Sequence, residues 1–225
     1  MELRNSPQVD LLLDKFESYL HVFDLICPFG EDKVTVHRDT IAIVRAASKP
    51  VDVLDNELWF RKMAETLALW GMNIRGARLN DLSEIRASFI ELRSSIVDIQ
   101  DCRLETIDLY YAVITGRKIG VLLENLRVGR QRAKLVANTK ALHHLLPDLV
   151  PPVDRKYTLK FFFDDSNIVQ RYSAQYLFEE MWPAFHKIAQ EAKHIIQNYL
   201  GQGMHTSIPK TIDNAIVGYI KIKEL

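Results

Sequence analysis

Apolar residues recur every three or four positions along nearly the whole chain, and no other feature constrains the fold as strongly. One run contains Trp59, Met63, Leu67 and Trp70, and the next contains Leu82, Ile85, Phe89, Leu92 and Ile96. This spacing places apolar side chains on one face of an α-helix, whereas a half-buried β-strand needs strict alternation. We therefore predict an all-α fold of about eight to ten helices. Residues 30–45 are less regular and leave room for at most one minor β-hairpin.

The length of 225 residues and the 48% share of apolar residues are enough for a substantial buried core. We predict one compact α-helical domain over residues 1–225, with 1–128 and 129–225 as the lobes if the chain divides. No stretch approaches the roughly 20 apolar residues that a membrane-spanning helix needs, and the first residues lack the apolar core of a secretory leader. These features predict a cytoplasmic protein without a membrane partner. Cys27 and Cys102 are expected to be reduced thiols in the core.

The charge is balanced over the whole chain but not within residues 127–160. Lys plus Arg and Asp plus Glu number 29 each, so a general polyanion binder is not indicated. Residues 127–160, in contrast, hold eight basic residues and two acidic ones, a local excess of six. We predict that part of this set contacts nucleic-acid phosphates: Arg127, Arg130, Arg132, Lys134, Arg155 and Lys156. The alternative is a solvated helix face whose countercharges come from elsewhere in the fold.

The same stretch holds a lysine and an aspartate that could form a reaction centre. Lys140 lies within an apolar helical run, and Asp154 follows the Val150-Pro151-Pro152 link. Burial disfavours the charged form of an amine and so favours its use as a nucleophile, while a nearby carboxylate can orient or stabilise it. We predict Lys140 and Asp154 as catalytic residues. The alternatives are that Asp154 only caps the next helix and that Lys140 extends its ammonium to water.

Other clusters favour structural interpretations. His143, His144 and Asp148 supply too few well-placed ligands to specify a metal site, and we expect neither a metal nor a cofactor. The chain has no glycine-rich phosphate loop and no hydrolase elbow. Near the end, Asp213 suits the positive end of a helix that begins after Ser207, so we assign Lys210 and Asp213 no functional role.

Lys140 lies on a predicted helix, and a short connector leads from it to Val153-Asp154 and a basic residue. This arrangement resembles the helix-hairpin-helix DNA glycosylases. The resemblance implies that Lys140 attacks the sugar C1′ as a Schiff-base nucleophile and that Asp154 assists departure of the base. It also implies that Arg130, Arg132 and Lys134 face the DNA backbone. The chain departs from that family in "LVANTK", which has no glycine before the lysine, and in its shorter connector. More broadly, "LWGMNIRGARL" with "LHHLLPDLVPPVDRKYTLKFF" is similar to prokaryotic proteins without an assigned activity.

Two functions therefore stay open at this point, with a small-molecule or metal site around His143, His144 and Asp148 as a weaker third. The first is a nucleic-acid-binding protein, in its enzymatic form a DNA glycosylase or lyase that uses Lys140 and Asp154. The second is a non-catalytic helical interaction or regulatory protein, which the zero net charge and the lack of a strong catalytic motif favour.

Overall fold

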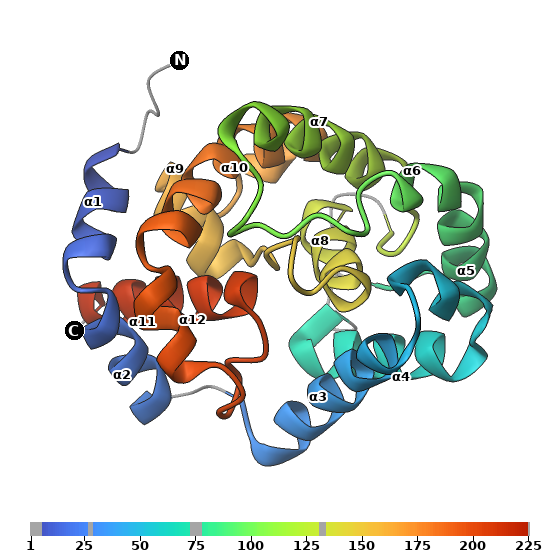
Figure 1. The fold of residues 1–225 in the computed structure, drawn as a ribbon, viewed down its shortest axis with the longest axis horizontal. Helices are drawn as coiled ribbons and strands as arrows, with labels where there is room; N and C mark the ends of the chain where they lie inside the picture. The colour runs from blue at the N-terminus through green and yellow to red at the C-terminus, as the bar shows by residue number, and fades with distance from the viewer. Residues whose placement is uncertain (1–5, 27–28, 73–77, 131–133, 225) are drawn as a thin grey trace.

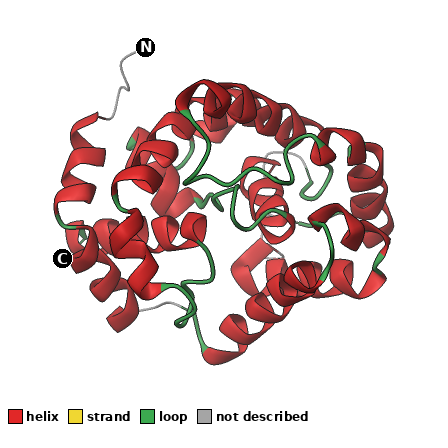
Figure 2. Cartoon of the chain, in the orientation of Figure 1, coloured by secondary structure: helices red, strands yellow, loops and turns green. Residues whose placement is uncertain are grey.

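The structure is a computed structural model that describes residues 6–26, 29–72, 78–130 and 134–224. The described chain is 74% helical and contains no β-strand (Figure 2). The all-α prediction is therefore confirmed. Residues 30–45, where a hairpin had been allowed for, form the continuous helix α3, Glu31–Ala46. Within the described ranges, every helix is too short or too polar to traverse a bilayer.

The described chain consists of α-helices, with shorter helical segments between some of them. In order they are α1 (Ser6–Asp14), α2 (Phe16–Ile26), α3, η1 (Pro50–Asp55), α4 (Glu57–Leu67), η2 (Ala68–Met72), α5 (Leu82–Glu91), α6 (Arg93–Val97), α7 (Leu109–Asn125), α8 (Lys134–Leu145), η4 (Arg155–Leu159), α9 (Lys160–Phe163), η5 (Ile168–Gln170), α10 (Ala174–Glu191), α11 (Lys193–Tyr199) and α12 (Ile208–Lys223). They outnumber the predicted eight to ten because several apolar runs are interrupted. At one such break, between Trp70 and Gly71, Gly71 adopts a φ of 82° that glycine takes without steric cost.

The beginning and the end of the described chain lie in the same half of the molecule. In Figure 1, α1 and α2 lie beside α11 and α12, whereas α3 to α6 form the opposite half. The helices α2 and α12 approach each other closely at Gly218. A Cβ atom at Gly218 would lie 2.0 Å from the backbone oxygen of Tyr19, so only glycine permits this distance. A division into lobes at residue 128 stays a prediction.

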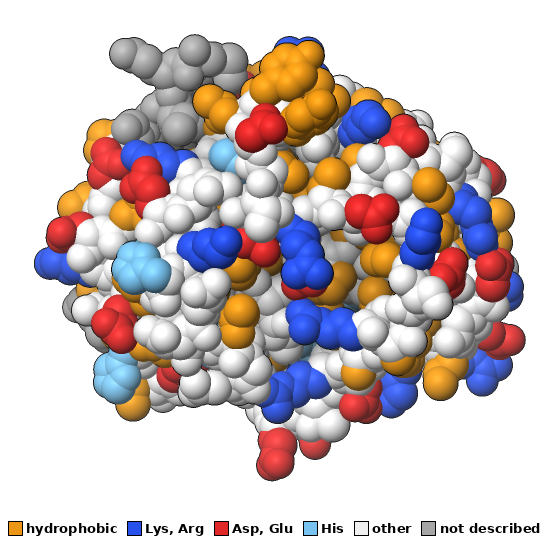
Figure 3. Space-filling model, viewed as in Figure 1, with side chains coloured by type: hydrophobic (Ala, Val, Ile, Leu, Met, Phe, Trp, Pro, Cys, Tyr) orange, Lys and Arg blue, Asp and Glu red, His pale blue; other side chains and the backbone are white. Residues whose placement is uncertain are grey.

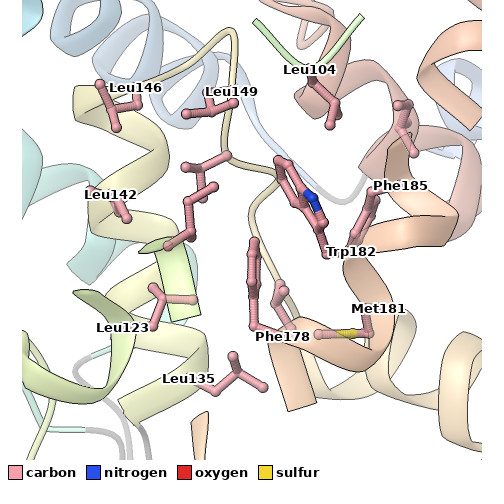
Figure 4. Packing of buried hydrophobic residues seen from close by; sticks show 14 of the residues in the cluster. Leu104, Leu123, Leu135, Leu142, Leu146, Leu149, Phe178, Met181, Trp182 and Phe185 are labelled. Atoms are coloured by element: carbon pink, nitrogen blue, oxygen red, sulfur yellow. The ribbon is translucent and has the colours of Figure 1, made fainter. Parts of the chain in front are cut away.

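Two helices are buried along almost their whole length. Every residue of α8 from Leu135 to Leu145 is buried, and so is every residue of α12 from Ile208 to Ile220. Figure 4 shows Leu135 and Leu142 of α8 facing Phe178 and Trp182 of α10 in the shared apolar core. A helix enclosed on all sides must satisfy each polar side chain that it carries inside the protein. Both of these helices carry charged side chains, and these side chains define the candidate site.

Candidate functional site

Lys140 and Asp154 face each other, as the sequence predicts. The Lys140 Nζ atom lies 3.2 Å from Asp154 Oδ2. Two hydrogen bonds fix the proline-containing link so that Asp154 reaches Lys140: His143 Nδ1 donates to the Val150 oxygen at 2.8 Å, and the Val153 N–H donates to Thr139 Oγ1 at 3.2 Å. The two α8 residues that form these hydrogen bonds, His143 and Thr139, are buried. The position of Asp154 is therefore set by α8 itself.

Asp154 serves as a helix cap and as an ion-pair partner at once. Its Oδ1 accepts the Lys156 N–H at 2.7 Å, and its Oδ2 faces Lys140. Burial raises the pKa of Asp154, but the Lys140 charge and the N–H groups of Lys156 and Tyr157 outweigh burial, and the pKa is lowered overall. Asp154 is therefore a carboxylate at neutral pH, and its side chain stays 33% exposed.

The pair opens onto a small cavity between the two halves of the fold. The cavity has a volume of about 40 Å³, and its polar and aromatic lining consists of Phe29, Trp70, Lys140, Asp154, Tyr157, Lys210 and Asp213. A single water needs about 10–15 Å³ on this measure, so the space holds a few waters but not a nucleobase. Phe29, Trp70, Asp154 and Tyr157 are only partly buried, so the cavity lies near the surface.

A second lysine–aspartate pair, for which we predicted no role, lines the same cavity. The Lys210 Nζ atom lies 2.7 Å from Asp213 Oδ2 and 2.5 Å from Asn214 Oδ1. The Lys210 side chain is only 1% exposed. One signal was present in the sequence: Lys210, Asp213 and Asn214 fall at i, i+3 and i+4 on a helix that is otherwise apolar around this face. A polar stripe on a fully enclosed helix indicates a buried polar network.

The indole ring of Trp70 lines the cavity and lies close to both lysines. The Lys140 and Lys210 ammonium nitrogens lie 5.8 Å and 5.6 Å from its centroid, within cation–π range. Lys210 also lies 5.5 Å from the ring centroid of Phe29. Trp70 follows the apolar spacing of α4, and this spacing predicts a core residue; instead it is half-buried and lines the cavity.

Three buried histidines lie behind the cavity, and their hydrogen bonds fix the tautomers of all three; His143 Nδ1 carries a proton because it donates to the Val150 oxygen. His144 Nδ1 lies 2.6 Å from the Lys140 oxygen, which can only accept, so His144 Nδ1 carries the proton. The bare His144 Nε2 must then accept from His37 Nδ1 at 3.0 Å, and the bare His37 Nε2 accepts from the Thr206 hydroxyl at 2.8 Å. Burial lowers the pKa of His144 to about 4 and holds the pKa values of His37 and His143 well below the ordinary value. All three rings are neutral at pH 7.

The predicted phosphate-binding residues divide into two groups. Arg127 pairs with Glu91, Arg130 with Asp81 and Lys134 with Glu124, so carboxylates from other segments offset these three cations. Arg155 and Lys156 follow Asp154 directly and are exposed; Arg155 donates to the Ser166 oxygen, and Lys156 lies over the Tyr157 ring. Arg132 lies outside the described residues. On the face shown in Figure 3, several basic side chains gather near the centre with acidic side chains among them, and toward the edges the two signs are interspersed.

The weaker candidates show no built metal site. Asp148 pairs with Arg45 at 3.1 Å rather than with His144. Among the described residues, no group of three or more His, Cys, Asp or Glu side chains is placed to hold a metal ion. Cys102 is a half-buried free thiol, and Cys27 lies outside the described residues.

Comparison of the chain with models of known protein families, with curated proteins and with solved structures finds no match. The resemblance to helix-hairpin-helix DNA glycosylases therefore stays a prediction based on the residues around Lys140 and Asp154.

Proposed function

We propose that this protein acts on nucleic acid as an amine-dependent lyase, with Lys140 as the nucleophile and Asp154 as its counter-ion. The observation that carries the proposal is the 3.2 Å approach of Lys140 Nζ to Asp154 Oδ2 beside a cavity near the surface. An amine and a carboxylate at this distance suit Schiff-base chemistry with an aldehyde carbon.

The charge on the pair supports an iminium intermediate. An ammonium and an aldehyde give one iminium and one water, so the nitrogen is cationic before and after the bond forms. Asp154 has a lowered pKa and stays ionised, so it can neutralise the nitrogen in both states without reorganisation. A fixed counter-ion of this kind stabilises charge that develops on the nitrogen during the reaction.

The size of the cavity favours the lyase over the glycosylase form of this function. About 40 Å³ accommodates the aldehyde carbon and oxygen of an opened sugar, but an intact base needs more room. The substrate that fits best is thus a nucleic acid from which a base has already been lost. Arg155 and Lys156, which flank Asp154, are the proposed phosphate contacts at the mouth of the cavity.

Borohydride trapping on DNA with a single abasic site tests the proposal. A covalent adduct is expected with the unaltered protein and is expected to disappear in Lys140→Ala. Lys118→Ala is the matched control, because Lys118 is an exposed lysine paired with Asp98 far from α8 in sequence and should leave the adduct unchanged. No adduct with the unaltered protein, or an adduct that survives Lys140→Ala, contradicts the proposal.

A non-catalytic interaction protein is the second candidate, and the outer face of α7 favours it. Large apolar side chains are exposed near the beginning of α7, with one more farther along the helix: Leu109, Tyr110, Tyr111, Val113, Ile114 and Val121. Exposed apolar patches often mark protein–protein contacts. In this case Lys140→Ala and Asp154→Asn should change stability without changing any turnover. A large loss of activity at an unchanged melting temperature would contradict the interaction role.

A further inference from the structure

Lys210 is the second charged amine of the cavity, and its surroundings differ from those of Lys140. Two of its three N–H groups have acceptors, Asp213 Oδ2 and Asn214 Oδ1. The third N–H has no hydrogen-bond acceptor among the described residues, and the ammonium lies 5.7, 5.5 and 5.6 Å from the ring centroids of Phe23, Phe29 and Trp70. Lys210 also contributes to the cavity lining. A lysine ammonium has three donors, so one remains for a ligand in the cavity.

The position of Lys210 is fixed by a chain of hydrogen bonds that reaches the surface. Asn214 Nδ2 donates to the Met204 oxygen at 3.2 Å and lies 3.2 Å from His205 Nδ1. His205 Nε2 in turn lies 2.9 Å from the exposed Asp24. The Lys210 ammonium is therefore held in one place by groups that themselves have partners.

Thr158 connects this second pair to the first one. Its hydroxyl donates to Asp213 Oδ1 at 3.4 Å and accepts the Asp154 N–H at 3.0 Å. The Asp213 carboxylate is thus linked through Thr158 to the backbone of Asp154, although the two residues come from different helical segments. Burying two such pairs costs desolvation energy that their mutual attraction only partly returns, so stability alone does not account for them.

We propose that the cavity is a site for small carbonyl compounds in which Lys210 donates its free N–H to the carbonyl oxygen while Lys140 attacks the carbon. The inference rests on the proposed function only for the role of Lys140 as nucleophile. It adds Lys210 as a further catalytic residue and Asp213 and Asn214 as positioning residues. The chemical class of the substrate is an aldehyde, whether it belongs to a nucleic acid or to a free small molecule.

The proposed step balances in atoms and charge. Lys140 first releases one proton, its lone pair forms the N–C bond, and the C=O π electrons move to the oxygen, which Lys210 stabilises and protonates. The carbinolamine nitrogen then gives up a second proton, the hydroxyl takes up one proton and leaves as water, and the nitrogen lone pair forms the C=N bond. One ammonium and one aldehyde have become one iminium and one water, and Lys210 recovers its proton from those released.

Reductive alkylation with propionaldehyde and cyanoborohydride tests this site without nucleic acid. Peptide mass spectrometry gives the extent of modification at each lysine. In the unaltered protein, Lys140 is expected to react faster than the exposed Lys118. Removing a proton donor typically lowers a rate by about a hundredfold or more, and we expect this loss at Lys140 in Lys210→Met.

The double variant Lys210→Met/Asp213→Leu controls for misfolding of the single variant, because it leaves no unpaired carboxylate in the core. It should show the same loss at Lys140, whereas Lys118→Met should show none. Equal rates at Lys140 and Lys118 in the unaltered protein, or undiminished Lys140 labelling in the folded double variant, would overturn the inference.

The same variants separate this inference from the nucleic-acid function. If propionaldehyde labels Lys140 in a Lys210-dependent manner but no abasic-site adduct forms, the carbonyl site stands and the nucleic-acid function fails. If the abasic-site adduct at Lys140 persists in the double variant, the nucleic-acid function stands and the role of Lys210 is overturned.

Discussion

The two lysine–aspartate pairs have the same chemistry but differ in how firmly the fold holds them. Lys140 and Asp154 come from α8 and from the link after it, meet at 3.2 Å, and leave the carboxylate one-third exposed. Lys210 and Asp213 lie one turn apart on α12, meet at 2.7 Å, and are almost completely buried. In the proposed reaction, the first pair supplies the amine that attacks the substrate, and the second supplies a proton donor that is held in one position.

The largest difference between the pairs should appear when each lysine is removed. Lys210→Met leaves Asp213 buried without a cation, and losing one partner of a buried pair costs about 3–5 kcal/mol. Urea denaturation should show this loss of unfolding free energy. The double variant Lys210→Met/Asp213→Leu should recover most of it, and a double variant as unstable as the single one would show that Lys210 acts through packing instead.

Acid should destabilise the protein next most strongly, through the histidines that support both pairs. The pKa of His144 is about 4 in the folded protein and 6.5 ordinarily, so between these values only the unfolded chain binds the proton. Stability therefore falls as the pH drops from about 6.5 to about 4 and is flat above, and this shift corresponds to roughly 3 kcal/mol at about pH 4. Denaturation midpoints measured across this range test the slope. His144→Gln should reduce the slope without abolishing it, because His37 and His143 also have lowered pKa values, and an unchanged slope in that variant would exclude His144 as a source.

Lys140→Met should cost less than Lys210→Met. Asp154 keeps the Lys156 N–H and contact with water after Lys140 is lost, so we expect a loss of about 1–3 kcal/mol. The comparison is made by urea denaturation under identical conditions. A loss of unfolding free energy equal to that of Lys210→Met would contradict the distinction between a partly exposed pair and a buried one.

Arg127→Ala should have the smallest effect. Arg127 pairs with Glu91 at the surface, where ion pairs add little to stability and salt screens them. The denaturation midpoint should stay within experimental error, and DNA binding should be unaffected because the countercharge already offsets this cation. A clear loss of DNA binding would instead restore Arg127 to the proposed interface.

The sequence predicts the first pair and misses the second for physical reasons. A short, stiff link between two helices limits where Asp154 can go, and hydrogen bonds from α8 to the link then hold it beside Lys140. Lys210 and Asp213 look the same whether their helix is at the surface or enclosed, and enclosure depends on α2 and the other helices that pack around α12. His37 joins His144 across more than a hundred positions, and no local pattern predicts such a contact.

The local charge excess in residues 127–160 was equally ambiguous. The acidic partners Glu91, Asp81 and Glu124 all lie outside residues 127–160. Only folding brings them to Arg127, Arg130 and Lys134. Helical periodicity, in contrast, is a property of neighbouring residues, so the all-α fold could be predicted directly. Interactions between distant segments decide the rest.

The close crossing of α2 and α12 at Gly218 has a consequence for how the protein is made. The ribosome synthesises α2 among the first helices and α12 after all the others described here. Until α12 has emerged, α2 lacks its principal neighbour and the cavity lacks Lys210. A nascent chain would therefore carry Lys140 without the groups that complete its surroundings, and the proposed site would be assembled only once α12 has emerged.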